Sequence, residues 1–525
     1  MSQRPLWQPD PYAAASSHMQ VFWRKVEKRR GRRFADYNQF HHWSVALRGQ
    51  FWSDLWDYCG VLGEKGDAPL IEPDGMLSAQ WFPDAHLNFA RNLLRNRGDG
   101  EALVFRGEDV VRRSVSHDEL YAQVAQCAAA MRKVGVTEGD RVAAYMPTLP
   151  ETVVVMLAAA SMGAIFSALA PDCSVEDVSE CFGQIQPRLL FVADSCLHEG
   201  KTQSALERVV EIAGRLPDLL GVVVVPYVQS DAKEMDAARA AIPKVCSWAD
   251  HLAPYAAVTQ IDFVELPFSF PLYITFSHGI SGALKCIAHG AGGTLLQHLK
   301  EHQLHCDIRA GDRLFFSANC SQAIWYWLVS ALGSGATLML YDGSPFGRSE
   351  NALWDYAEGE HFTHFGAPLD YFETLLKRGI KPVHTHDLNH LRSLMTIESN
   401  LTEEISNYVY RNIKQTLWLN AVSGCPDTLS CFLLGNPLEP VWYADVQYKA
   451  LGMGVAVFDQ TGRAVIGDEG ELVCTESFPS MPVMIWNDPD GSRYRQAYFR
   501  HFPNIWSRGT RGRETLRGCI MGCGK

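Results

Sequence analysis

Strand-like apolar segments alternate with helix-like segments through the middle of this 525-residue chain. The strand-like segments lie at residues 102–105, 141–146, 189–193, 272–277, 313–318, 337–342, 362–367, 391–397 and 417–423. Parallel strands need crossover connections and bury both faces, so this order predicts an α/β fold: one large domain with mostly parallel sheets flanked by helices.

One helix has a clear beginning and end in the sequence. Ser116 is followed three residues later by Glu119, which is the spacing of a capping box. Apolar residues then recur at helical spacing from Leu120 to Met131, and Gly135 follows. We therefore predict a helix that begins after Ser116 and ends at Gly135.

Residues 152–170 form a 19-residue stretch without a charged side chain. A window count over such a stretch predicts a membrane span. However, Pro150 and Glu151 precede it, Gly163 divides it, and Pro171 ends it. We predict a buried helix of about a dozen residues followed by a strand, and no membrane span.

Charge and cysteine usage exclude several classes of protein. Lysine plus arginine number 47 against 59 aspartate plus glutamate, a formal net charge of -12, so no nucleic-acid binding is expected. The basic run at 24–33 is read as a solvated helix face, with a nucleic-acid or membrane patch as the alternative. The 14 cysteines are scattered without a C-x-x-C pair, which indicates neither a zinc site nor disulfides. The first 17 residues lack the apolar core of a secretory signal, so a cytosolic (cytoplasmic) location is predicted.

The loop after the strand at 272–277 has the composition of a phosphate-binding loop. It runs from Ser277 to Lys285 and contains Gly279, Ser281 and Gly282. Glycines let the backbone approach a ligand, hydroxyls donate hydrogen bonds, and a lysine neutralises negative charge. The loop does not fit the Walker pattern, and an ordinary glycine-serine turn that leads into a helix is the alternative.

This loop, together with HGAGG at 289–293 and YDGSPF at 341–346, resembles the adenylate-forming acyl-CoA synthetases. The resemblance runs through nearly the whole chain, and the segment 479–506 is similar to the acetoacetyl branch of that family. Other matching segments are 51–61, 81–94, 150–172, 182–191, 295–307, 451–459 and 467–474.

The resemblance implies an acetoacetate–CoA ligase that works in two steps. ATP and the acetoacetate carboxylate give an acyl-adenylate and pyrophosphate, and the sulfur of coenzyme A then displaces AMP. Mg²⁺ and hydrogen-bond donors stabilise the developing phosphate charge. The implied nucleotide-binding residues are Ser277, Gly279, Ser281, Gly282, Lys285, Ser399, Gly424, Asp427 and Thr510, and Trp325 and Trp327 are placed in the substrate pocket.

The same resemblance implies a domain organisation. Residues 1–90 form an N-terminal cap, and residues 91–507 form the adenylating, AMP-binding domain. Residues 508–525 are rich in glycine and arginine and lack an apolar period, so they are predicted to be a disordered stub. The small C-terminal domain of the family, with its catalytic lysine, is predicted to be missing.

Several positions depart from the family pattern, among them Ser281 and Cys425, where the family has threonine and glycine, and residues 318–322, where it has a Thr-Thr-x-Gly-Trp run. The family has serine, threonine, glycine, threonine and aspartate where this chain has His278, Ile280, Glu398, Pro426 and Thr510. Ile280 removes a hydroxyl donor, and Pro426 has no backbone N–H. The departures favour a second hypothesis, a catalytically impaired relative that at most binds nucleotide or a partner. A ligase for another short carboxylic acid is the third.

Replacing Glu398 with glycine is expected to tighten ATP binding, because the carboxylate adds bulk and negative charge where the family binds adenine. Isothermal titration with Mg²⁺-ATP measures the change in Kd against the unmodified chain. Submillimolar affinity that is the same in both proteins would show that this turn has been assigned wrongly.

Overall fold

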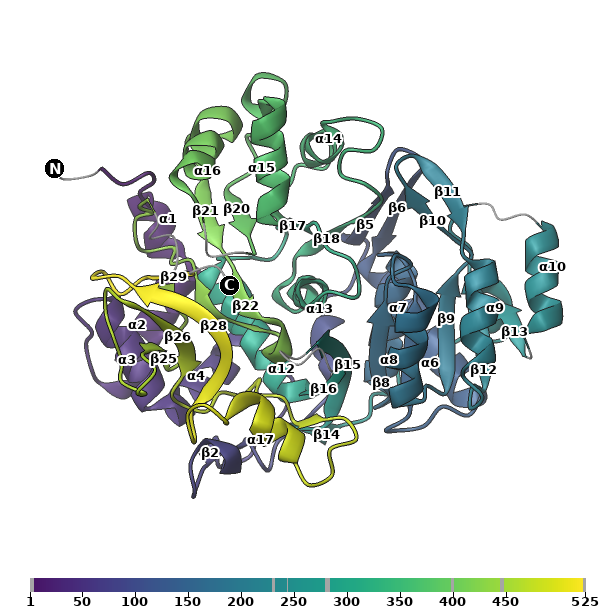
Figure 1. The fold of residues 1–525 in the computed structure, drawn as a ribbon, viewed down its shortest axis with the longest axis horizontal. Helices are drawn as coiled ribbons and strands as arrows, with labels where there is room; N and C mark the ends of the chain where they lie inside the picture. Colours follow the sequence, from purple (N-terminus) through teal and green to yellow (C-terminus); the bar gives the residue numbers. More distant parts are fainter. Residues whose placement is uncertain are drawn as a thin grey trace.

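The computed structural model describes residues 4–228, 232–242, 244–278, 284–397, 401–443 and 448–522. Two large sheets with their helices form most of the molecule (Figure 1). Beside them lie an N-terminal group of helices, drawn in purple, and a small C-terminal sheet, drawn in yellow. The predicted α/β class, with mostly parallel sheets flanked by helices, is confirmed.

The first large sheet has eight strands. Six run parallel, and β16 and β27 are added at one edge by antiparallel pairing. In spatial order the strands are β13 (Val245–Ser247), β12 (Gly221–Val225), β9 (Leu189–Ala193), β7 (Arg141–Tyr145), β8 (Ile165–Leu169), β15 (Pro271–His278), β16 (Leu284–Gly290) and β27 (Met484–Ile485).

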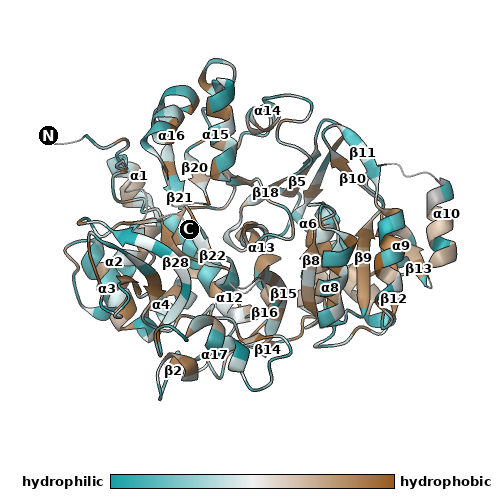
Figure 2. Cartoon of the chain, viewed as in Figure 1, coloured by the Kyte–Doolittle hydropathy of each residue, from teal (hydrophilic) through white to brown (hydrophobic). Residues whose placement is uncertain are grey.

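Alternate residues of β9 pack into different cores. Leu190 and Val192 pack with α8 (Val175–Ile185) and α9 (Leu206–Gly214). Leu189 and Phe191 belong to the core shared with α6 (His117–Lys133) and α7 (Pro150–Ser161). Both faces of the strand are therefore buried, which is why its sequence is continuously apolar. In Figure 2 the strand is coloured hydrophobic, while α8 and α9 carry hydrophilic colour.

The second large sheet has seven strands. The two that come first in the sequence lie together at one edge of it. All strands except β6 run parallel. In spatial order they are β21 (Trp418–Ala421), β20 (Ser393–Thr396), β19 (His364–Ala367), β17 (Arg313–Phe316), β18 (Thr337–Asp342), β5 (Glu101–Gly107) and β6 (Val111–Ser116). Its covering helices include α13 (Ala323–Ser330), α14 (Ala352–Gly359), α15 (Leu369–Arg378) and α16 (Glu403–Tyr408). The helix α12 (Ala291–Leu299) packs against α13 and against β15 and β16 of the first sheet.

Both local predictions on helices are confirmed. The capping box forms at the start of α6: the Ser116 hydroxyl accepts from the Glu119 N–H, and the Glu119 carboxylate accepts from the Ser116 N–H. The charge-free stretch is the fully buried helix α7 followed by β8. Across the ranges that the structure describes, no helix has the length and apolarity needed to cross a membrane.

The N-terminal helices are α1 (Pro11–Ser16), α2 (His18–Arg30), α3 (Tyr37–Ala46) and α4 (Arg48–Cys59). Aromatic rings hold them together: Phe22 contacts Phe40 and Phe51, and Phe40 stacks on Trp43. Residues 24–30 of the basic run lie on α2, where Arg30 binds Asp54 of α4 at 2.9 Å.

Two predictions need correction. The loop after β15 leads directly into strand β16, which returns antiparallel to β15, and not into a helix. The predicted disordered stub is wrong for most of its length, because β28 (Trp506–Glu514) and β29 (Ile520–Gly522) are strands. They join β25 (Val455–Phe458) and β26 (Glu469–Cys474) in a four-stranded sheet. β28 pairs with β26, which lies far from it in the sequence, so local apolar periodicity does not reveal this pairing; β29 pairs with β28 through a short hairpin.

Replacing Asn88 with alanine is expected to lower the free energy of unfolding by about 1–3 kcal/mol. The buried amide nitrogen of Asn88 lies 3.2, 3.0 and 2.8 Å from the carbonyl oxygens of Ala160, Ser161 and Val264, which would lose their donor. Chemical denaturation measures the change. The exposed Asn389→Ala is the control, with an expected effect within about 0.5 kcal/mol; equal effects at both positions would contradict the argument.

Candidate functional site

A buried carboxylate, Asp427, lies where the end of the β15–β16 hairpin meets the C-terminal sheet. It sits on the short turn Pro426–Thr428 between β22 (Ser423–Cys425) and β23 (Ser430–Leu434), and its side chain is fully buried. The Lys285 Nζ lies 2.5 Å from Oδ2, and the Tyr498 hydroxyl donates to the same oxygen at 2.9 Å. The Arg508 guanidinium lies 3.4 Å from Oδ1. Two cations therefore surround one carboxylate.

Four separate parts of the chain supply these groups. Lys285 is the second residue of β16, and its register partner on β15 is Ser277. Tyr498 is the last residue of helix α17 (Ser492–Tyr498), and its ring stacks on buried Trp506 with centroids 3.9 Å apart. The stacking fixes the direction of the tyrosine hydroxyl toward Asp427.

Arg508 lies on a bulge of strand β28. Ser507 pairs with Val473 and Arg511 pairs with Glu471, so three residues of β28 lie opposite Leu472 alone. Gly509 adopts a positive φ of 79° there, and its N–H donates to Glu471 at 2.8 Å. Bulges redirect side chains out of the regular alternation, and this one accompanies the contact of Arg508 with Asp427.

The cations decide the charge state of Asp427. Burial by itself raises the pKa of this carboxyl, but Arg508, Lys285 and the hydrogen bonds from Lys285 and Tyr498 outweigh burial and hold the pKa below its ordinary 3.8. Nearby His289 is buried, and burial lowers its pKa to about 3. A neutral His289, bonded to Thr275 at 2.8 Å, fits a packing role better than that of a base.

The structure brings together three of the predicted nucleotide-binding residues, Ser277, Lys285 and Asp427. Gly424 is exposed on β22, and Thr510 is exposed on β28 two residues after Arg508. Gly279, Ser281, Gly282 and Ser399 lie outside the described residues, as do Ile280 and Glu398.

The two predicted substrate-pocket tryptophans are core residues of α13. Trp325 is fully buried against Phe166 and Tyr326. Trp327 is also buried, and its indole N–H donates to Glu301 at 3.0 Å. Their assignment to a substrate pocket stays a prediction.

The sequence did not reveal Arg508 or Tyr498. Both lie in or next to the segment that carries the family resemblance, but only the three-dimensional structure places them at Asp427, 81 and 71 residues away along the chain (508 − 427 and 498 − 427). The one sequence feature that could have indicated Arg508 as a site residue is its charge, since it lies between the buried Trp506 and Gly509.

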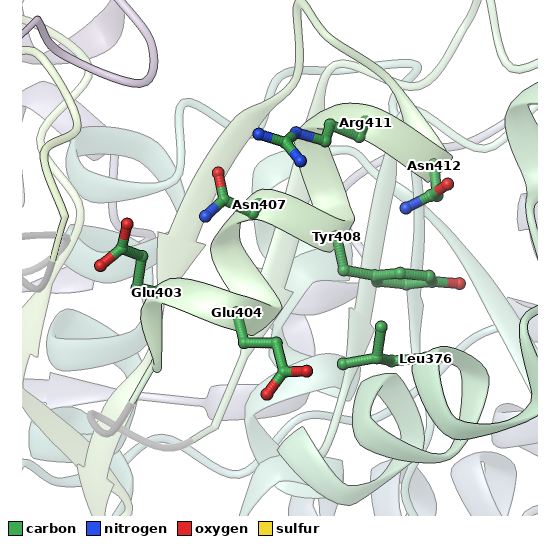
Figure 3. A pocket seen from close by; sticks show the side chains of 7 residues that line it. All are labelled: Leu376, Glu403, Glu404, Asn407, Tyr408, Arg411 and Asn412. Atoms are coloured by element: carbon green, nitrogen blue, oxygen red, sulfur yellow. The ribbon is translucent and has the colours of Figure 1, made fainter.

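Two cavities lie away from this cluster. One of about 520 Å³ lies between α15 and α16 and mixes acidic, basic and amide side chains (Figure 3). The other, of about 440 Å³, lies beside α17. Leu376, Glu403, Glu404, Asn407, Tyr408, Arg411 and Asn412 line the first, and Leu77, Arg495, Gln496, Phe499, Arg500, Pro503 and Asn504 line the second.

The described side chains do not form a ready metal site. Among them, no group of three or more His, Cys, Asp or Glu side chains converges. Mg²⁺ commonly binds through one or two carboxylates plus substrate phosphates and water. Asp427 is the carboxylate at the site, but Lys285, Tyr498 and Arg508 face its oxygens. These residues by themselves do not offer a free ligand set for Mg²⁺.

Comparison with known proteins identifies the family. The AMP-binding enzymes match residues 89–478. An acetoacetyl-coenzyme A synthetase of Rhizobium meliloti (strain 1021) is 47% identical over 520 residues, which are 99% of this chain and 79% of the relative. This chain belongs to the acetoacetyl-CoA synthetase family.

Further relatives of this family agree with the assignment. The acetoacetyl-CoA synthetase of Mus musculus is 39% identical over 97% of this chain and 76% of its own length. The solved acetoacetyl-CoA synthetase from Streptomyces lividans has a TM-score of 0.93 at 33% identity, covering 100% of this chain and 80% of that one. The two alignments cover 97–99% of this chain and 79% and 76% of the two relatives, and the predicted absence of a C-terminal domain is not among the things they show.

Replacing Lys285 with methionine is expected to lower the free energy of unfolding by about 1.5–3 kcal/mol at pH 7, the range for a hydrogen bond to a charged group. The ionised Asp427 stabilises the fold above its ordinary pKa of 3.8, and this contribution is lost as the pH falls through the folded-state pKa. The difference between the variant and the parent protein should therefore shrink below about pH 4. Denaturation at a series of pH values measures it.

Lys377→Met is the matched control for this experiment, because Lys377 forms an exposed ion pair with Glu373. Its expected effect is below about 1 kcal/mol at every pH. A Lys285→Met effect that does not change with pH would contradict the account of Asp427.

Proposed function

We propose that this chain ligates acetoacetate to coenzyme A with ATP. The observation that carries the proposal is the 47% identity to an acetoacetyl-coenzyme A synthetase over 99% of the chain. The buried cluster around Asp427 supports it, because it holds a lysine at the base of the predicted phosphate-binding loop.

The reaction has two steps whose atoms balance. An acetoacetate carboxylate oxygen attacks the α-phosphorus of ATP and releases pyrophosphate, giving acetoacetyl-adenylate. The thiolate sulfur of coenzyme A then attacks the acyl carbon, and AMP leaves. Mg²⁺, entering with ATP, would neutralise phosphate charge.

Within this proposal the residues of the chain orient charge toward the nucleotide. Lys285 neutralises negative charge at the end of the loop 277–285, and Asp427 fixes the direction of its ammonium group. Arg508 adds a second positive charge on the far side of the carboxylate. We propose that the nucleotide contacts Ser277, Gly279, Ser281, Gly282, Lys285, Ser399, Gly424, Asp427 and Thr510. Fixed cations in a buried site need no reorganisation during the reaction.

The hypothesis of a catalytically impaired relative receives no support from the comparisons, so we propose an active ligase. A ligase for another short carboxylic acid would use the same nucleotide site and a different acyl pocket. We also propose a cytoplasmic location, a cap at 1–90 and an adenylating domain at 91–507.

Replacing Lys285 with alanine is expected to slow acetoacetate-dependent pyrophosphate release by about 10²–10³-fold, the loss typical of one preorganised electrostatic group. Mass detection of acetoacetyl-CoA follows the second step. Lys377→Ala on the exposed face of α15 is the control and should retain the parent rate. Absence of any product from the parent chain contradicts the proposed function; higher turnover with acetate or butyrate than with acetoacetate favours the third hypothesis.

A further inference from the structure

Two fully buried side chains bind the backbone that directly follows Asp427. They are His298, near the end of α12, and Glu301, on the π-helix Lys300–His305 that continues α12. The His298 Nε2 lies 2.6 Å from the Leu429 carbonyl oxygen, and the Glu301 carboxylate accepts from the Cys431 N–H at 2.8 Å. Leu429 and Cys431 follow Asp427 by two and four residues.

The Leu429 carbonyl fixes which nitrogen of His298 carries the proton. Burial lowers the pKa of His298, so the ring is neutral and has one N–H. A carbonyl oxygen can only accept, so the short contact with Leu429 requires the proton on Nε2. The Ser330 hydroxyl lies 2.8 Å from Nδ1 and 2.9 Å from the Tyr326 carbonyl oxygen, and its one proton is shared between these two acceptors.

Glu301 is held as firmly as His298. One of its oxygens accepts from Cys431 and from the Gln297 amide at 3.1 Å, and the other accepts from the Trp327 indole at 3.0 Å. The Lys300 ammonium lies 3.6 Å away and compensates its charge. The Trp327 indole therefore helps to orient the Glu301 carboxylate.

The turn needs such support because its backbone is unusual. Leu429 adopts a left-handed conformation, with φ 46° and ψ 38°, which is rare for a leucine. Residues in sparsely populated conformations persist where the surrounding structure fixes them. The conformation of Leu429 is fixed by the hydrogen bonds at its own carbonyl and at the Cys431 N–H.

We propose that His298 and Glu301 are positioning residues for the adenylation step, an inference that rests on the proposed function. By holding the Leu429 carbonyl and the Cys431 N–H, they keep Asp427 where it binds both Lys285 and Arg508. They act on the site through this turn and touch neither Lys285 nor Arg508 in the hydrogen bonds described above.

A pair of amide substitutions tests the role of the Nε2 donor. The glutamine in His298→Gln can place its amide nitrogen near the Nε2 position and keep the bond to Leu429. The asparagine in His298→Asn is too short to reach it. We expect His298→Asn to lower kcat for acetoacetate-dependent pyrophosphate release by about 10–100-fold at saturating ATP, and His298→Gln to stay within about threefold of the parent. A purely structural role would lower thermal stability in both without this rescue.

Hydrogen–deuterium exchange of peptides covering residues 425–432 gives a second readout that needs no activity. It should be faster in His298→Asn and unchanged in His298→Gln. If His298→Asn does not fold, the isosteric Glu301→Gln replaces it: its amide meets the Cys431 and Trp327 donors with only one oxygen, so faster exchange is expected.

The outcomes separate the two proposals. Equal rates and equal exchange in the parent and His298→Asn, or a His298→Gln protein as slow as His298→Asn, overturn the positioning role. Unchanged exchange in Glu301→Gln overturns it as well. If the parent chain shows no acetoacetate-dependent activity, the proposed function fails, and exchange alone then decides whether His298 and Glu301 hold the turn.

Discussion

The negative charge of Asp427, removed from water, is the constraint on which the site depends. An isolated buried carboxylate is costly unless cations and hydrogen bonds compensate it. Lys285, Tyr498 and Arg508 supply that compensation from a hairpin, a helix and a C-terminal strand. The site can therefore exist only when all three segments have folded together.

The N-terminal helices contribute to the same arrangement without touching Asp427. The Tyr37 hydroxyl donates to the Lys449 carbonyl, and the Lys449 side chain binds Glu514 on β28 at 2.7 Å. The Lys300 ammonium, beside Glu301, lies 5.8 Å from the ring centroid of Trp52 on α4. Through these contacts the N-terminal helices support both the strand that carries Arg508 and the helix that carries His298.

The elements that the sequence predicted well are those whose signals are local. The strand 189–193 matches β9 because both of its faces are buried, and the capping box of α6 lies within four residues. The proximity of Lys285 and Asp427 followed from the family resemblance. In contrast, β16 was missed because its apolar run does not distinguish a returning strand from a helix. Arg508 and Tyr498 were missed because their partner lies more than 70 residues away.

The bulge in β28 lets one strand both pair with β26 and place Arg508 at the site. Trp506 and Ser507 on one side, and Arg511 to Arg513 on the other, keep regular pairing with β26. Arg508, Gly509 and Thr510 lie in the interruption between these two paired stretches. The two paired stretches therefore hold β28 in the sheet, and the bulge between them places the Arg508 guanidinium at Asp427. A substitution at position 508 can therefore change the electrostatic environment of the buried carboxylate during evolution. It does not have to shift the register in which β28 pairs with β26.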